Sequence, residues 1–436
     1  MDYRHEMRDT VHVFIGLDDQ ERKVVDSPPF QRLRHIHQLA TTYLVYPGAT
    51  HKRFEHSLGV MELATRIFDT ITAPYNLTDE IRQRMSEITD ERRKQYWRSV
   101  LRMAALCHDL GHLPFSHAAE KELLPEGWSH ERIGVELINS EKMKEVWEYQ
   151  KPPLKPQDIA KLAVGPEKMP EEEFSDWETL LSEIIVGDTF GADRMDYLLR
   201  DSYHAGVVYG KFDHHRLIDN LRILREPEGD HFTLGVDEGG LHCCEALLLA
   251  RYFMYSQVYF HPVRRIYDIH LKEFLKEWLK HIHKRDFFPV EDMDEFLRIT
   301  DVEVLQALRK AYEDKNETGH VHAVRILGRQ HFRVLYTRNP DDIKRNPDAV
   351  QKVYEAACSE FGEENVRADQ YTEEKGTFDF PVRKRDGRIV SSLAESQVLQ
   401  NLPVATVGYV FVNREHYEKA VKWLREKRET ILEQGI

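Results

Sequence analysis

The segment Leu106–His112 places two histidines and an aspartate within otherwise apolar sequence. Val100–Ala105, which precedes it, is apolar nearly all round, and this predicts a buried helix that continues into His108 and Asp109. His112 follows His108 by four residues and would share its helix face. A buried carboxylate needs a cation or several hydrogen-bond donors. Two interpretations therefore remain for this segment alone: a metal ion beside the helix, or a satisfied core histidine next to a capping aspartate.

Two further segments add polar groups to apolar helix faces. His56 falls on an apolar stripe of helical spacing, and Asp193, Tyr197 and Asp201 recur at i, i+4 and i+8 in a third predicted helix. Two imidazoles and two carboxylates make a mixed nitrogen and oxygen donor set that suits Mg, Mn, Fe, Ni or Zn. Such an ion polarises a phosphoryl oxygen and acidifies a bound water. The candidate ligands are His56, His108, Asp109 and Asp193.

The order H…HD…D, with its flanking residues, resembles the HD phosphohydrolase superfamily. Within it, residues 30–34, 46–60, 107–117 and 128–131 resemble the deoxynucleoside triphosphate triphosphohydrolases and the HD domain of the vertebrate SAM/HD enzyme that limits dNTP pools. The similarity covers roughly residues 5–340, and runs of this length are far more specific than an isolated HD dipeptide. The resemblance implies a metal-dependent enzyme that splits a dNTP into deoxynucleoside and inorganic triphosphate.

Several histidines near the HD motif supply imidazoles, the side chains best matched to proton transfer near pH 7. The resemblance implies that His112 and His130 act on the phosphates or the leaving oxygen. It also implies that His117 and Glu120 assist as a histidine–acid pair. A structural hydrogen bond is the alternative for each single histidine.

A triphosphate carries up to four negative charges, so several cationic side chains must converge on it. The resemblance assigns phosphate contacts to Arg53, Arg194 and Arg251, and sugar contacts to Gln38, Leu39, Tyr197 and Asp201. Tyr259 matches the aromatic residue that crowds the 2′ carbon, which implies deoxynucleotides over ribonucleotides. Phe260 departs from the vertebrate pattern near the base, so the base preference stays open.

The resemblance also implies a regulatory nucleotide. Asp26, Gln31 and Arg34 match positions that hold the guanine of an activator, and Arg329 and Arg333 resemble residues that meet regulatory phosphates. We therefore expect activation by a guanine nucleotide or a dNTP, coupled to assembly as a homotetramer. The alternative is a surface salt bridge between Asp26 and Arg34. Asp237 and Gly239 replace basic residues of the vertebrate enzyme and weaken the regulatory interpretation.

The elements that must position these residues are mostly helical. The pattern predicts a helical HD core over residues 1–285 and a smaller α+β region over residues 286–436. Polar loops are expected at 78–93 and 152–176. Strands are expected at 232–236, 332–336, 377–380 and 405–412, and a terminal helix at 416–433.

Composition restricts the function classes. The chain has 436 residues and a net charge of −14, which argues against a dedicated protein that binds nucleic-acid duplexes but leaves room for a local basic groove. Its four cysteines have no C-x-x-C spacing, and no segment is long and apolar enough to act as a signal peptide or membrane span. These features predict a cytoplasmic protein without membrane contact.

Two alternatives to a dNTP triphosphohydrolase remain. Another HD phosphohydrolase would act on nucleoside monophosphates or guanosine alarmones. A catalytically inactive protein would use the same pocket to sense nucleotides or to bind single-stranded nucleic acid. The presence of every expected metal ligand favours an active enzyme.

Overall fold

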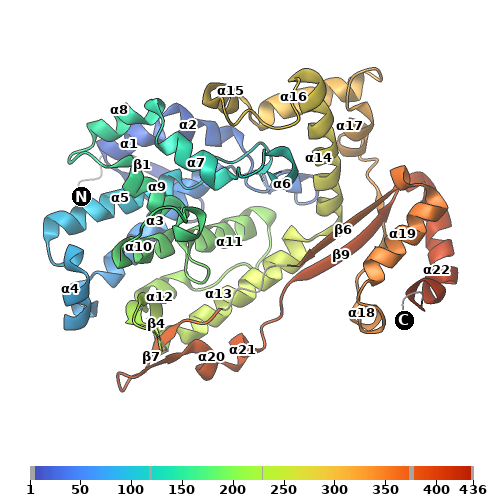
Figure 1. The fold of residues 1–436 in the computed structure, drawn as a ribbon. Coiled ribbons are helices and arrows are strands. Elements are labelled where there is room, and N and C mark those ends of the chain that lie inside the picture. Colours follow the sequence, from blue (N-terminus) through green and yellow to red (C-terminus); the bar gives the residue numbers. More distant parts are fainter. Residues whose placement is uncertain (1–4, 117–119, 228, 373–377, 434–436) are drawn as a thin grey trace. The chain divides into compact units, whose positions relative to one another are not determined.

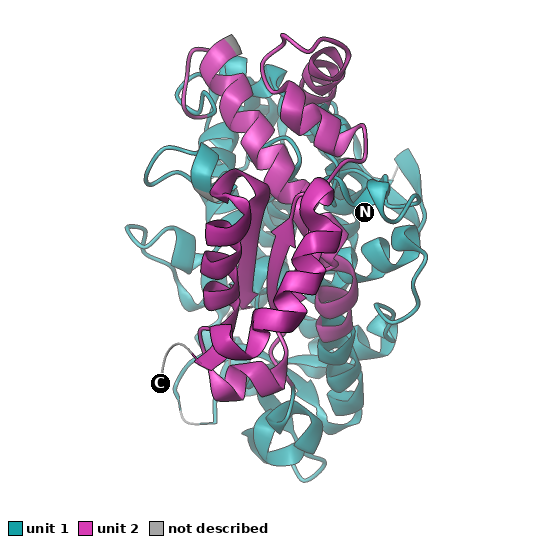
Figure 2. Ribbon diagram, turned by 90° about the vertical axis from the view of Figure 1, so that its right-hand side faces the viewer, with its two compact units in different colours: residues 1–251, 288–301, 376–402 teal, residues 252–287, 302–375, 403–436 magenta. Residues whose placement is uncertain are grey.

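The computed structural model describes residues 5–116, 120–227, 229–372 and 378–433 (Figure 1). The chain forms two compact units, each assembled from separate stretches of sequence (Figure 2). Unit 1 comprises residues 1–251, 288–301 and 376–402, and unit 2 comprises residues 252–287, 302–375 and 403–436. Whether a boundary near residue 285 separates two domains stays a prediction.

Unit 1 is mostly helical, as predicted. Its helices are α1 (Asp19–Val25), α2 (Pro28–Arg32), α3 (Arg53–Ile71), α4 (Asp79–Arg84), α5 (Glu91–Cys107), α6 (Glu120–Leu123), α7 (His130–Ile138), α8 (Glu141–Tyr149), α9 (Pro156–Val164), α10 (Asp176–Val186), α11 (Ala192–Ala205), α12 (His214–Asp219), α13 (Leu241–Met254, which ends in unit 2), α15 (Met293–Arg298), α20 (Ser392–Glu395) and α21 (Gln397–Gln400). No helix among the described residues combines the length and apolarity needed to cross a bilayer.

Two small sheets complete unit 1. An antiparallel hairpin pairs β1 (His5–Asp9) with β2 (Val13–Leu17). The second sheet has the order β3-β4-β7-β8, formed by Leu221–Arg225, Phe232–Asp237, Pro381–Arg383 and Ile389–Ser391. The strand predicted at 232–236 is thus confirmed as β4.

Unit 2 contains the predicted α+β arrangement. Its sheet has the order β5-β9-β6, formed by Arg333–Thr337, Thr406–Val412 and Val366–Thr372, and all pairs are antiparallel. Its helices are α14 (Pro262–Ile282), α16 (Asp301–Glu313, which begins in unit 1), α17 (His320–Ile326), α18 (Pro340–Arg345), α19 (Ala349–Phe361) and α22 (Tyr417–Glu433).

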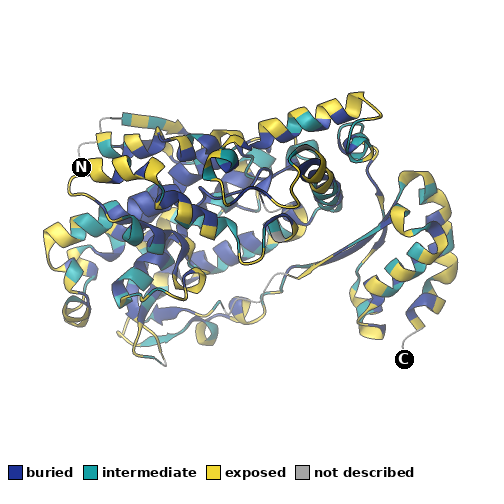
Figure 3. Ribbon diagram, turned by 45° about the horizontal axis from the view of Figure 1, so that its top comes forward, coloured by how far each residue is buried: buried dark blue, intermediate teal, exposed yellow. Residues whose placement is uncertain are grey.

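Helices α19 and α22 form a core with this sheet. Val353 and Ala357 from α19, Leu424 from α22 and Val410 from β9 belong to one buried apolar cluster. Both helices are exposed on the opposite side, which Figure 3 shows as yellow residues near the C-terminus. This amphipathic pattern explains why the sequence predicted the terminal helix and the strands at 332–336 and 405–412 within a residue or two.

Three local predictions were wrong. The expected polar loop at 78–93 contains helix α4, and α5 begins within it at Glu91. Phe378–Phe380 forms no strand, and Thr377 lies outside the described residues; pairing starts at Pro381, where β7 meets β4. The expected polar loop at 152–176 contains helix α9. Pro156 at the first position of α9 is compatible with a helix start, and Ile159 and Leu162 are buried.

Candidate functional site

Three packed helices of unit 1 bring the predicted metal ligands together. Helix α3 packs against α5 and α11, because α3 is buried along most of its length and the C-terminal half of α5 is buried. His56 lies in the first turn of α3, His108 and Asp109 directly follow α5, and Asp193 lies in the first turn of α11.

The HD pair lies just beyond helix α5 and not inside it. Helix α5 ends at Cys107, and residues 108–111 form turns, so the expected helical face shared by His108 and His112 is wrong. The chain instead turns back, and Nε2 of His112 lies 3.0 Å from Oδ1 of Asp109. Gly111 lets the backbone of His130 approach this turn closely, because a Cβ at position 111 would lie only 2.0 Å from the carbonyl oxygen of His130.

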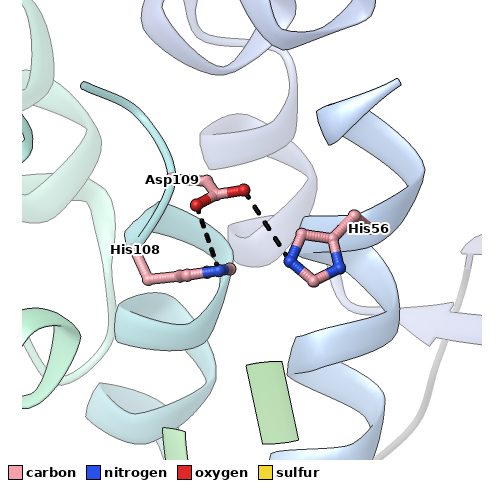
Figure 4. A group of neighbouring side chains, drawn as sticks. All are labelled: His56, His108 and Asp109. Atoms are coloured by element: carbon pink, nitrogen blue, oxygen red, sulfur yellow. Dashed lines mark ion pairs between the residues drawn. The ribbon is translucent and has the colours of Figure 1, made fainter. Parts of the chain in front are cut away.

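Asp109 presents one carboxylate oxygen to each of two imidazole rings (Figure 4). Its Oδ1 lies 3.4 Å from Nε2 of His108, and its Oδ2 lies 3.7 Å from Nε2 of His56. Oδ1 of Asp193 lies 2.9 Å from Nε2 of His56 and 3.6 Å from Nε2 of His108. The four predicted ligands therefore surround one small volume.

The hydrogen bonds of His108 leave one nitrogen available. Nδ1 lies 2.8 Å from the carbonyl oxygen of Ala105, so this nitrogen carries the proton and donates. Nε2 is buried and accepts no hydrogen bond from any residue that the structure describes. A buried polar atom without a partner is costly, and coordination of a metal ion would remove that cost.

The surroundings of His56 show an excess of negative charge. Burial alone would lower the pKa of this ring, but hydrogen bonds with Asp193 and Asp196 and the charge of Asp109 raise it to about 10. Three carboxylates thus attract a cation to this point. The donor set and its charge fit a divalent metal ion.

A second group of imidazoles lies beside these ligands. The rings of His112 and His130 stack with centroids 4.0 Å apart. Oε1 of Glu120 lies 2.6 Å from Nδ1 of His130 and also accepts its backbone N–H. Burial lowers the pKa of both rings. For His130 the hydrogen bond to Glu120 outweighs burial, so its pKa is raised. For His112 the charge of Arg53 acts in the same direction as burial, so its pKa is well below the ordinary value. His117 lies outside the described residues.

Sequence reasoning missed a buried carboxylate in contact with the metal ligands. Oδ2 of Asp196 lies 2.8 Å from Nδ1 of His56 and accepts from Arg200. The available signal was an acid–arginine pair at i, i+4 within an otherwise buried helix, one turn after Asp193.

A second missed residue, Asp301, anchors the loop that follows the HD motif. Phe115 and Ser116 adopt left-handed φ values of 55° and 56°, which non-glycine residues seldom occupy. Oδ1 of Asp301 accepts the backbone N–H of Phe115 at 2.7 Å, and its Oδ2 accepts the backbone N–H of His37. No local sequence pattern connects positions 186 residues apart.

The three arginines predicted to contact phosphate lie in unit 1, and each contacts an acidic or aromatic side chain there. Nη1 of Arg53 lies 2.5 Å from Asp109, so this guanidinium is at the cluster itself. Arg194 donates to Asp188 at 3.1 Å, and Arg251 is buried with its guanidinium over the ring of Phe378.

The predicted sugar contacts are divided between the units. Gln38, Leu39, Tyr197 and Asp201 belong to unit 1, where Nε2 of His51 lies 2.7 Å from Oδ1 of Asp201. Tyr259 belongs to unit 2 and packs edge-on against Tyr255 with centroids 5.1 Å apart.

The predicted regulatory residues also fall in both units. In unit 1, Asp26 pairs with Arg22, and Arg34 donates to Gln31 at 2.9 Å. The alternative salt bridge between Asp26 and Arg34 was therefore wrong, because each has a closer partner one helical turn away in sequence. Arg329 and Arg333 lie in unit 2.

Comparison with known proteins adds independent information. Residues 53–164 match the HD domain, and residues 212–385 match the HD associated region. The chain is 31% identical over 389 residues to the uncharacterized protein YwfO of Bacillus subtilis, which covers 86% of this chain and 80% of YwfO. It is also 31% identical over 376 residues to the deoxynucleoside triphosphate triphosphohydrolase SAMHD1 of Gallus gallus, which covers 78% of this chain and 57% of that protein.

A solved structure shares the fold. The crystal structure of a hypothetical protein from Aquifex aeolicus matches with a TM-score of 0.77 and 33% sequence identity, and the match covers 96% of this chain and 99% of that one. The chain spans little more than half the length of some curated relatives that it matches.

Proposed function

Because the chain belongs to the HD-domain phosphohydrolase family, we propose that it is a metal-dependent hydrolase that splits dNTPs into deoxynucleoside and inorganic triphosphate. The observation that carries this proposal is the open Nε2 of His108 beside the stacked pair His112–His130. The similarity to SAMHD1 of Gallus gallus supports the dNTP as substrate.

The proposed chemistry divides between the two groups of side chains. A divalent ion held by His56, His108, Asp109 and Asp193 would polarise a phosphoryl oxygen. Its identity among Mg, Mn, Fe, Ni and Zn is open.

His112 and His130 have environments that shift their pKa values in opposite directions, which is the usual basis of an acid and base assignment. The hydrogen bond to Glu120 keeps the ring of His130 protonated, and this ring can transfer a proton to the leaving 5′ oxygen. His112 stays neutral and can accept a hydrogen bond or a proton. Arg53 adds positive charge next to the reacting phosphate.

Product analysis tests the proposal directly. Each of the four dNTPs is incubated with the protein and Mg²⁺ or Mn²⁺, and the products are separated by anion exchange. We expect inorganic triphosphate and deoxynucleoside. Release of orthophosphate or pyrophosphate would indicate a different HD phosphohydrolase, and binding without any product would indicate a nucleotide sensor.

Sugar selection is a further part of the proposal. If Tyr259 excludes a 2′-hydroxyl, dGTP is cleaved much faster than GTP, and Tyr259→Ala narrows this difference. Equal turnover of GTP and dGTP by the wild type would contradict the assignment.

We also propose activation by a guanine nucleotide or dNTP, coupled to a homotetramer. Hydrolysis of dTTP is measured with and without GTP or dGTP while the mass in solution is followed. Stimulation that is lost in Asp26→Ala supports the regulatory assignment, and stimulation that survives unchanged places the activator elsewhere. A cytoplasmic location stays a prediction from the sequence.

A further inference from the structure

A buried set of charged side chains connects His56 with the N-terminal hairpin. Oδ2 of Asp196 lies 2.8 Å from Nδ1 of His56, and Oδ1 lies 2.7 Å from Nε2 of His12. Arg200 donates to both oxygens, at 2.7 and 3.0 Å. The side chains of all four residues are fully buried, so solvent cannot replace these contacts.

The hairpin end is fixed by a second carboxylate. Asp9, at the end of β1, accepts from Nη1 of Arg200 at 2.8 Å. Its other oxygen accepts the backbone N–H groups of Val11 and His12, both at 2.8 Å. Asp9 therefore sets the backbone of the turn from which His12 reaches Asp196.

Helix α3 leaves room for this network at Gly59. A Cβ at this position would lie 2.0 Å from Oδ1 of Asp196 and 2.5 Å from Nη2 of Arg200. A glycine inside a helix costs about 1 kcal/mol relative to alanine. The close approach of the α3 backbone to the buried Asp196–Arg200 pair gives this glycine a structural reason.

We propose that Asp196 and His12 are positioning residues of the metal centre, and that the β1–β2 hairpin is a working part of it. Asp196 accepts the Nδ1–H of His56, which fixes the ring so that Nε2 presents its lone pair to the ion. His12 holds the second oxygen of Asp196 and so fixes the carboxylate. Carboxylates that hold a ligating imidazole in this way typically change metal affinity by about 10–100-fold when altered.

This inference rests on the metal centre of the proposed function but not on the identity of the nucleotide. Its test is therefore direct binding of Mn²⁺ to the full chain without nucleotide, measured from the electron paramagnetic resonance signal of free Mn²⁺. Thermal unfolding of each variant confirms that the protein compared is folded.

The decisive comparison uses two amides at position 12. His12→Gln keeps a donor of similar reach, whereas the amide of His12→Asn is too short to contact Asp196. We expect the Kd for Mn²⁺ to rise about 10-fold in His12→Asn and to return toward the wild-type value in His12→Gln. Phe14→Ala, in the same hairpin but with an exposed side chain, is the control and should leave the Kd unchanged.

Asp196→Asn gives an independent measurement. It is isosteric and should raise the Kd for Mn²⁺ by about 10–100-fold; it decides the question if His12→Asn does not fold. Folded His12→Asn and Asp196→Asn proteins that bind Mn²⁺ with the wild-type Kd would overturn the inference. A wild type that binds neither Mn²⁺ nor any of Mg, Fe, Ni and Zn would overturn the metal centre as well, whereas one that binds Mn²⁺ but cleaves no dNTP would overturn only the proposed function.

Discussion

Each unit contains a cluster of two histidines and one carboxylate, and the two clusters differ mainly in what surrounds them. His56, His108 and Asp109 lie in unit 1, and His270, Glu273 and His322 lie in unit 2. In both, the potential ligand atoms lie within 4.8 Å of one another. His112, Glu120 and His130 form a third such group, in unit 1, so residue types and distances alone would suggest three metal sites.

The cluster in unit 2 is already compensated. Nε of Arg367 lies 2.5 Å from Oε1 of Glu273, and Nη1 of Arg325 lies 3.5 Å from its Oε2. Nε2 of His270 accepts the backbone N–H of Phe332, so its Nδ1 carries a proton and faces Glu273 at 3.2 Å. No nitrogen of His270 is left for an ion.

The cluster in unit 1 shows the opposite balance. Nε2 of His108 has no hydrogen-bond partner among the described residues, and Asp193 and Asp196 add negative charge around His56. Arg53 pairs with Asp109 and Arg200 pairs with Asp196, so the carboxylates of unit 1 also have cationic partners. The difference that remains is the imidazole nitrogen without a hydrogen-bond partner in the described part of the chain, and we expect this available lone pair, rather than proximity of ligand-type residues, to distinguish a metal site.

The largest expected effect comes from neutralising one carboxylate in each cluster. Asp109→Asn removes a charged ligand, so we expect loss of the bound ion and a fall in hydrolysis of about 1,000-fold or more. Glu273→Gln should retain the ion. Elemental analysis of both purified proteins, with activity measured in parallel, checks this. Loss of metal from Glu273→Gln would show that the cluster in unit 2 also binds an ion.

In the cluster of unit 2, we expect the same kind of substitution to lower the stability of the fold. Glu273→Gln leaves Arg325 and Arg367 without their carboxylate, and an uncompensated, partly buried charge pair costs about 3 kcal/mol. Urea unfolding followed by circular dichroism should show a lower midpoint. Glu303→Gln, on the exposed face of α16 in the same unit, is the control. A wild-type midpoint for Glu273→Gln would mean that the arginines do not depend on Glu273.

The sequence indicated four candidate metal ligands, because they belong to apolar segments of helical periodicity and the order of motifs is specific; the structure brings the four together, with His108 and Asp109 just beyond helix α5. It predicted the helical body and the α+β region for the same reason, since amphipathic periodicity is a local property. Asp196, His12 and Asp301 were missed because their partners are distant: His56 and Asp196 are 140 residues apart, and His12 and Asp196 are 184 apart. Such contacts depend on how α3, α11 and the hairpin pack.

The pairing of Glu120 illustrates the same limit at short range. The resemblance implied a pair with His117, which lies outside the described residues, so that pair stays a prediction; among the described residues Glu120 is hydrogen-bonded to His130. The two segments meet because helix α7 starts at His130 and lies against the turn at Gly111. Only the folded chain defines that contact.

Neutralising the Glu120 carboxylate should have a smaller effect on hydrolysis. Glu120→Gln removes the charge that raises the pKa of His130, so this ring holds its proton less firmly at neutral pH. We expect kcat to fall by about 10–100-fold with the ion still bound. Glu122→Gln, an exposed neighbour two residues later, is the matched control. Unchanged kcat across pH 6–8, an interval of about one unit either side of neutrality, would remove His130 as the proton donor.

The smallest effect concerns a half-buried carboxylate whose hydrogen-bond partners among the described residues include no arginine. Glu183, on α10, accepts from the hydroxyl of Thr233 and the backbone N–H of Leu234, both on β4. Burial, with a further contribution from the charge of Glu226, raises its pKa to about 7. Here protonation, and not a neighbouring cation, neutralises the carboxylate.

The sign of its pH dependence follows from proton uptake. Between the ordinary glutamate pKa and about 7, the folded chain binds more protons than the unfolded chain, so this group lowers the free energy of unfolding as the pH rises through that interval. Glu183→Gln cannot ionise and keeps both hydrogen bonds. We expect the variant to be more stable than the wild type by about 2 kcal/mol at pH 8 and to show little difference at pH 4.5. Urea unfolding of both proteins at the two pH values measures this; a difference that does not change with pH would mean that Glu183 stays ionised and that an unrecognised cation compensates it.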